Sequence, residues 1–298
     1  MMTRRTAMVR VLVVLMLVLA GARGEAQVTA KPALYRLESG SSFTRGCYPP
    51  CLCPIFTTED IRGTYSLAFD HQDPLFTWYR VENVNWVVTL GGVDTRISGS
   101  GTYRVGGEVA VQQQMTLKLK VGDEEPQVFE SGLVPGGSSF PEIDITVSVN
   151  GMVCFDTVID IRSKPVPAAD ITPYTLSDSN CVEGCFPPCV CPSREWPVNG
   201  TFALVPLNNA TTPTRREFAV VNVKRETRFG TYQIVEAGPT SQQRMVLDLT
   251  EAGSGITSTF DSGQVPGGSA FPRIDIDLSV NGFSCSDKAL YLHAAPSP

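Results

Sequence analysis

The residues of this sequence best suited to chemistry are its cysteines, which occur in two similar sets. Each set begins with a C-x3-C-x-C cluster in a proline-rich segment, GCYPPCLCP at 46–54 and GCFPPCVCP at 184–192, and ends with one distant cysteine. The sets are Cys47, Cys51, Cys53 and Cys154, then Cys185, Cys189, Cys191 and Cys285. An even number of cysteines in an exported domain predicts two disulfides per set, one of which joins the cluster to the distant cysteine. Four cysteines permit three pairings, and only a bond within C-x-C is disfavoured, because its cysteines share a strand face.

A four-thiolate zinc site is the alternative chemistry for each set. Three thiolates on a loop and one on a neighbouring strand could surround the metal tetrahedrally. The spacing differs from that of a standard zinc finger, and oxidation during export competes with metal loading. We therefore favour disulfides and expect neither a metal nor another cofactor.

The ninth cysteine, Cys181, has no cysteine counterpart, since Phe43 stands 138 positions earlier. An unpaired cysteine in an exported protein is either an exposed thiol without a role or a site of intermolecular bonding. A dimer linked through Cys181 is the functional alternative.

Catalytic residues are harder to find. The only histidines, His71 and His293, have no counterparts in the other half of the chain, and no catalytic sequence motif is present. Asp156 and Asp287 each lie two residues beyond the distant cysteine, where alternation would turn them inward. We favour a β-bulge that turns them outward; the alternative is burial with a partner or a cation. We assign no catalytic residue, and the absence of catalytic motifs weighs against an enzyme without excluding one.

The N-terminal segment is typical of a secretory signal peptide. Three arginines precede an apolar run at 11–20, and small residues follow it. The run is too short for a transmembrane anchor, which needs about twenty apolar residues. We predict a signal peptide at 1–26 and a protein located in the periplasm, at the cell surface or outside the cell. Without this segment, 20 basic residues face 29 acidic ones, and the formal charge of −9 disfavours nucleic acid as a partner.

The chain repeats itself beyond the cysteines. The segment FESGLVPGGSSFPEIDITVSVNG at 129–151 matches FDSGQVPGGSAFPRIDIDLSVNG at 260–282, in the same order relative to the cysteine clusters. Such a repeat predicts two copies of one structural unit. We place the first domain at 34–163, a proline-rich linker at 164–172 and the second domain at 173–293.

Both domains are predicted to be all-β, because apolar residues alternate with polar ones between turn-forming segments. The expected strands of the first domain are 64–69, 76–81, 85–90, 102–105, 111–120, 127–130 and a hairpin that begins at 142. The architecture is therefore two tandem antiparallel domains of about eight strands, each a β-barrel or a β-sandwich. Asn150-Gly151 is expected to close a two-residue hairpin in which Val147 faces Cys154 on the core side, and Asn281-Gly282 to repeat it.

These patterns favour a noncatalytic secreted protein with a structural or binding role. One alternative is a β-barrel that binds a small apolar ligand such as a lipid. Another is a hydrolase that uses the repeated carboxylates.

Overall fold

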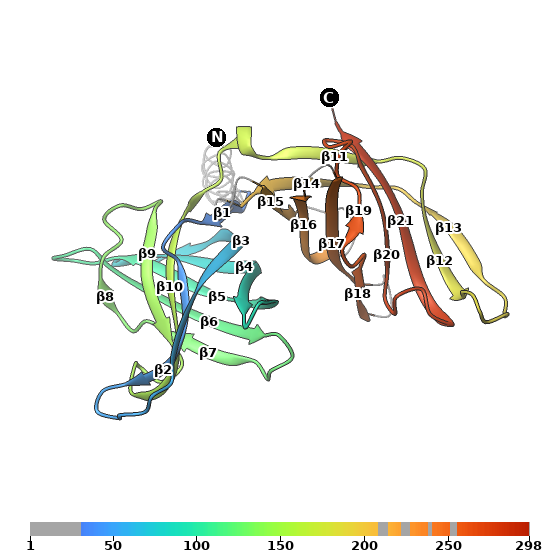
Figure 1. Cartoon of the computed structure of the whole chain (residues 1–298). Coiled ribbons are helices and arrows are strands. Elements are labelled where there is room, and N and C mark those ends of the chain that lie inside the picture. Colours follow the sequence, from blue (N-terminus) through green and yellow to red (C-terminus); the bar gives the residue numbers. More distant parts are fainter. Residues whose placement is uncertain (1–30, 208–213, 222–226, 238–239, 251–254, 298) are drawn as a thin grey trace, which may run out of the picture. The chain divides into compact units, whose positions relative to one another are not determined.

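The protein is described from a computed structural model that covers residues 31–207, 214–221, 227–237, 240–250 and 255–297. The predicted signal peptide lies outside these residues. The described chain is nearly all β, which confirms the predicted fold class (Figure 1). Its one helical element among the described residues is a 3-10 turn, η1 (Ala168–Asp170). No described helix has the length and apolar character needed to cross a membrane.

The first sheet closes on itself. Its strands β3 to β7 pair in sequence order, β7 pairs with β9, and β9 pairs with β10. The ring is completed by β1 and β2, which both lie between β10 and β3. The strands are β1 (Ala33–Leu37), β2 (Ser42–Tyr48), β3 (Phe56–Gln72), β4 (Phe76–Leu90), β5 (Val93–Gly106), β6 (Gln112–Val121), β7 (Gln127–Glu130), β8 (Val134–Pro135), β9 (Ile143–Ser148) and β10 (Cys154–Pro165).

The second sheet has the same order of pairing. Eight strands form a closed ring, and the β12–β13 pair continues from β21 beyond it. The strands are β11 (Thr172–Leu176), β12 (Ser179–Cys185), β13 (Arg194–Val198), β14 (Thr201–Pro206), β15 (Arg215–Val221), β16 (Thr227–Ala237), β17 (Thr240–Thr250), β18 (Thr257–Asp261), β19 (Val265–Pro266), β20 (Ile274–Ser279) and β21 (Ser286–Pro296). Of the two architectures that the sequence left open, the closed barrel is observed.

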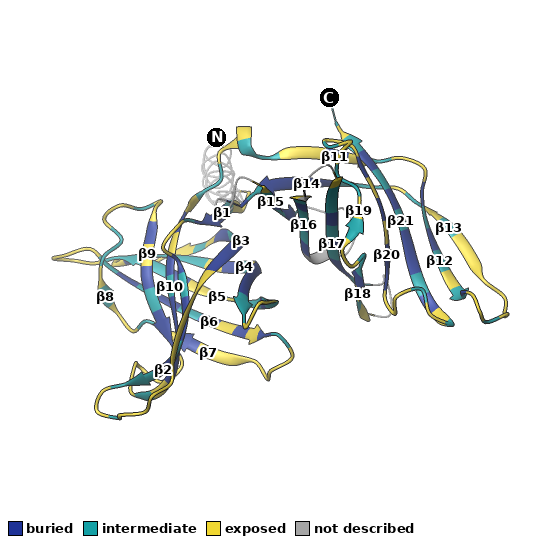
Figure 2. Cartoon of the chain, viewed as in Figure 1, coloured by how far each residue is buried: buried dark blue, intermediate teal, exposed yellow. Residues whose placement is uncertain are grey.

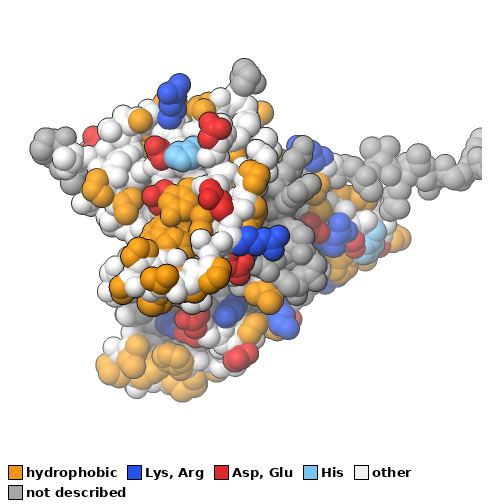
Figure 3. All heavy atoms as spheres, turned by 90° about the vertical axis from the view of Figure 1, so that its right-hand side faces the viewer, with side chains coloured by type: hydrophobic (Ala, Val, Ile, Leu, Met, Phe, Trp, Pro, Cys, Tyr) orange, Lys and Arg blue, Asp and Glu red, His pale blue; other side chains and the backbone are white. Residues whose placement is uncertain are grey.

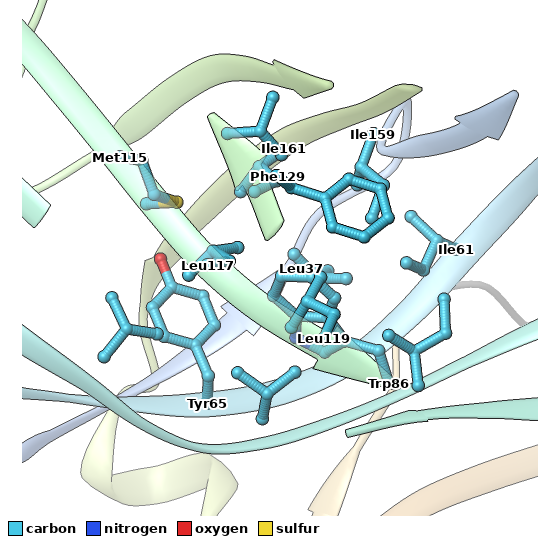
Figure 4. Close-up of a cluster of buried hydrophobic side chains, with 14 of the residues drawn as sticks. Leu37, Ile61, Tyr65, Trp86, Met115, Leu117, Leu119, Phe129, Ile159 and Ile161 are labelled. Carbon is cyan, nitrogen blue, oxygen red and sulfur yellow. The ribbon is translucent and has the colours of Figure 1, made fainter. Parts of the chain in front are cut away.

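Large side chains fill the interior of the first barrel. Alternate residues of β6, Met115, Leu117 and Leu119, point inward, and the buried faces of the strands follow the same period of two (Figure 2). Trp86 and Phe129 are buried against them, so side chains meet across the centre of the ring (Figure 4). These side chains pack closely against one another in the first barrel.

Two strands predicted in the first domain are one continuous strand. The segments 76–81 and 85–90 both belong to β4, whose pairing with β5 shifts register between Val81 and Val84. Asn83 has a positive φ of 54° in this bulge. Asparagine accepts the left-handed region and is common in turns. Asn83 therefore suggested a turn between two strands, whereas it lies in a bulge within one strand.

The predicted Asn-Gly hairpin is wrong in its register. Val147 pairs with Ile159, and the ladder ends with the Val149 amide donating to the Thr157 carbonyl at 3.1 Å. The loop between β9 and β10 is therefore longer than two residues. Its positive φ values fall on Gly151 (64°) and Met152 (59°) instead of on Asn150 and Gly151. Cys154, predicted to face the core opposite Val147, instead begins β10 at the rim of the barrel and pairs with Tyr48 of β2.

Buried tyrosines make the fold sensitive to alkaline pH. Burial raises the pKa of Tyr35 to about 12, and burial also raises the pKa of Tyr65, Tyr103 and Tyr232. A phenol whose pKa is raised by folding stabilises the native state fully below pH 10, its unfolded pKa, and this stability is lost as the pH rises toward 12.

We expect the free energy of unfolding to fall steeply above about pH 10. Ultraviolet absorbance of tyrosinate should rise only partly at pH 10 and complete its rise when far-ultraviolet circular dichroism is lost. Full ionisation of all eight tyrosines at pH 10 in a folded protein would contradict this expectation.

Candidate functional site

The cysteines form the same pair of bonds at one end of each barrel. Cys47 bonds Cys53, and Cys51 bonds Cys154. The second domain has the bonds Cys185–Cys191 and Cys189–Cys285. In each domain the short bond closes the proline-rich loop on itself. The long bond joins that loop to the loop before the last strand. This pairing is one of those that the sequence left open.

In the first domain these bonds fix a terminal structure that we call the braced end, residues 46–58 and 149–156. The Cys47 amide donates to the Ile55 carbonyl and the Cys51 amide to the Tyr48 carbonyl, both at 3.1 Å. The loop after β2 extends past the strands of the ring (Figure 1). Two disulfides and these hydrogen bonds give the loops a defined shape although they lie outside the ladder.

Asp156 lies beneath the braced end as a buried carboxylate that is 2% exposed. Its Oδ1 accepts hydrogen bonds from the amides of Asn150 (2.9 Å) and Thr157 (2.7 Å), and its Oδ2 accepts one from Met152 (2.7 Å). The favoured expectation of an outward side chain is thus wrong. The partner is the backbone of the loop, whose amides donate charge-assisted hydrogen bonds to the carboxylate.

Asp287 has the same role in the second domain. It is 5% exposed and accepts from the amides of Val280, Asn281, Phe283 and Lys288 at 2.7 to 3.2 Å. Each carboxylate has its oxygens engaged by backbone donors, which leaves it poorly placed to exchange protons with a substrate. The described residues contain no group of three or more histidine, cysteine or acidic side chains that could hold a metal ion.

The surface of the first braced end is apolar. Its exposed hydrophobic residues are Leu52, Ile55, Phe56, Val149, Met152, Val153 and Phe155, and Leu52 at the apex is fully exposed. The segments 46–58 and 145–155 contain no charged residue. An exposed group of this kind on a folded domain marks a contact surface more often than it serves the fold.

The second domain has a corresponding braced end, residues 184–196 and 280–287, with polar residues at four of the equivalent positions. Ile55, Phe56, Val153 and Phe155 correspond to Ser193, Arg194, Ser284 and Ser286. The apex is shared, since Val190 is as exposed as Leu52.

The remaining rings of this second end are partly covered. Phe283, which corresponds to Met152, packs edge-on against Phe186 at 5.7 Å. Arg194 and Lys288 lie over the ring of Trp196. On the face turned to the viewer in Figure 3, which is the side of β12 and β13 in Figure 1, hydrophobic side chains gather in a patch that has acidic and basic side chains beside it. The same scaffold therefore presents an apolar end in one domain and a mixed one in the other.

Cys181 is 6% exposed in β12, with Leu290 and Trp196 as its strand neighbours. The interpretation as an exposed thiol is wrong, because the Cys181 side chain is buried. A dimer linked through Cys181 stays a prediction.

The two histidines lie on separate surfaces. His71 stacks on Trp78 at 5.5 Å between ring centroids, and its Nδ1 is 2.8 Å from an oxygen of Asp70. His293 lies in β21, with its Nδ1 3.0 Å from an oxygen of Asp275. Neither histidine is near Asp156 in the strand ladders.

Comparisons with known proteins yield no relative. No protein-family model matches the chain, and no curated protein and no solved structure is similar enough to match. The braced ends must be interpreted from their own residues. Sequence reasoning located their cysteines and Asp156 but did not compare the residues between them, where the difference between Phe155 and Ser286 was already visible.

Proposed function

We propose that this protein is a noncatalytic exported binding protein. In this proposal the two barrels are rigid scaffolds, and the apolar braced end of the first barrel is the surface that contacts a partner. Four disulfides and the signal-like N-terminal segment support export, because such bonds persist in oxidising compartments.

The observation that carries the proposal is the contrast between the two ends. Both ends have the same disulfide pairing, the same buried aspartate and the same proline-rich loop. The second end keeps this geometry with Ser284 and Ser286 where the first has Val153 and Phe155. The apolar side chains are therefore not needed to build the end. Their exposure to water is unfavourable unless a partner covers them.

The observed packing favours this role over the two alternatives. A barrel that carries a small apolar ligand needs an internal cavity, whereas Trp86, Phe129 and their neighbours fill the first ring. A hydrolase needs carboxylates that can reach a substrate, whereas Asp156 and Asp287 are buried and bound to backbone amides.

Site-specific photocrosslinking tests the proposal. With p-benzoylphenylalanine at position 52, irradiation in the native host should give discrete adducts. The matched position 190, equally exposed on the second end, should give at least fivefold less. Adding the substitutions Ile55→Ser, Phe56→Arg, Val153→Ser and Phe155→Ser should remove the adducts at 52. Equal labelling at 52 and 190 would contradict a contact surface confined to the first end.

A further inference from the structure

The apolar braced end is separated from the nearest charges by uncharged residues. Along β3, Phe56 is followed by Thr57 and Thr58 before the first acidic pair, Glu59 and Asp60. Both acids are exposed, and at the rise of a strand Glu59 lies roughly 10 Å from Phe56. Apolar, hydroxyl and charged side chains thus follow one another with increasing distance from the apex.

The charges behind the apex are mainly acidic. Arg45, which precedes the braced end on β2, is engaged by Glu124 through two hydrogen bonds of 2.8 and 2.5 Å. The turn that carries Glu124 also contributes Asp123 and Glu125. The side of the barrel behind the apolar end therefore favours water and carries excess negative charge.

The backbone at the apex has few donors to satisfy. Pro49, Pro50 and Pro54 have no N–H, and the Cys51 amide donates to the Tyr48 carbonyl. Only Leu52 and Cys53 among residues 49–54 bring a further N–H to the apex. A loop of this kind brings few free N–H donors with it when it leaves water, and free donors are costly in lipid.

We propose that the apolar braced end of the first barrel inserts into the surface of a zwitterionic lipid bilayer. This inference rests on the proposed function and names the partner of its binding surface. The apex is fully exposed at Leu52, uncharged and poor in free donors, and a fluid acyl layer can surround such a tip from all sides.

The acidic residues decide between the candidate partners. In a symmetric pair of copies joined through this end, the acidic groups around Glu59 and Glu124 of both copies would be brought toward the same interface, and their like charges oppose that contact. Anionic lipid would repel the same groups. A zwitterionic headgroup layer brings no net charge to them.

Vesicle flotation with the full chain is the direct test. The wild type should float with phosphatidylcholine vesicles. The single change Phe155→Ser should weaken partitioning about tenfold, and Ile55→Ser, Phe56→Arg, Val153→Ser and Phe155→Ser together should weaken it at least 100-fold. The control Val190→Ser in the second end should leave it unchanged. All variants share the same N-terminal segment, so differences among them report on the braced end.

A fluorescent reporter makes the test independent of the combined variant. Leu52→Trp should show a blue-shifted emission when phosphatidylcholine vesicles are added, and Val190→Trp should not. Adding anionic lipid should reduce the shift. A stronger response to anionic vesicles, equal responses at 52 and 190, or unchanged flotation of the combined variant would each overturn the bilayer proposal.

The outcomes separate this inference from the proposed function. If the wild type does not float but forms a dimer in analytical ultracentrifugation that the combined variant lacks, the partner is a second copy and only the bilayer is rejected. If crosslinks at 52 join a different protein, the bilayer is rejected in the same way. If position 52 gives neither crosslinks nor a lipid response, both proposals fail.

Discussion

Replacing Cys51 and Cys154 together by serine will lower the free energy of unfolding of the first barrel by about 4 to 5 kcal/mol. The bond closes a loop with a sequence separation of 103 residues, and its loss frees that loop in the unfolded chain. Urea denaturation without reductant, followed by tryptophan fluorescence, to which Trp86 in the first core contributes, measures the change. Changing both cysteines avoids a new free thiol.

The second domain provides the matched control for this experiment. Cys189 and Cys285 close a loop of nearly the same separation, 96 residues. Their replacement should destabilise the second barrel by a similar amount and leave the first transition in place. A loss of under 1 kcal/mol in the first barrel would show that the loop ends stay together without the bond. The braced end would then depend mainly on Asp156.

Asp156→Asn will destabilise the first barrel by about 2 to 4 kcal/mol. The carboxylate accepts from three amides, and an asparagine must turn its own NH₂ group toward at least one of them. A buried donor left without an acceptor costs about 1 to 3 kcal/mol, and the charge-assisted part of the remaining bonds is also lost. Chemical denaturation gives the global change, and hydrogen exchange should become faster at the Met152 amide.

An exposed acid on the same hairpin is the control for Asp156. Asp144 has a side chain that is 79% exposed and lies 3.7 Å from Arg162. Asp144→Asn should change stability by no more than about 0.5 kcal/mol, as expected for an exposed ion pair. Equal effects at 144 and 156 would mean that Asp156 acts through charge in general and not through the loop amides.

Local sequence patterns predicted where the strands lie better than they predicted where the strands begin and end. Alternation in Ile143, Ile145 and Val147 correctly placed β9, because one face of that strand packs in the core. The same rule failed at Asn150-Gly151, where it predicted a tight turn. The loop there is held by Asp156 and by the bond to Cys51, residues that lie outside any two-residue turn. Long-range partners decided the register at this point, and a local pattern contains no information about them.

The candidate site was predictable only in part. The even cysteine count indicated disulfides, and the position of Asp156 next to the hairpin cysteine marked it as unusual. Alternation did not predict that Phe56 and Phe155 are exposed. The first residues of β10 pair with β2 alone, and β10 pairs with β9 only from Val158 onward. A comparison of the two copies would have shown that Arg194 and Ser286 stand where the first copy has these two aromatic residues. It would not have shown that the two aromatic side chains lie at the same end of the barrel.

The long disulfide also determines how the first domain responds to force along the chain. β1 and β10, the two ends of the domain, lie antiparallel, so tension would separate them first. Once they part, the bond between Cys51 and Cys154 carries the load and keeps the residues between them out of the extended chain. At about 3.4 Å per residue, roughly 350 Å of contour length stays locked. A domain of this kind yields only its outermost strands under tension and keeps most of its barrel intact.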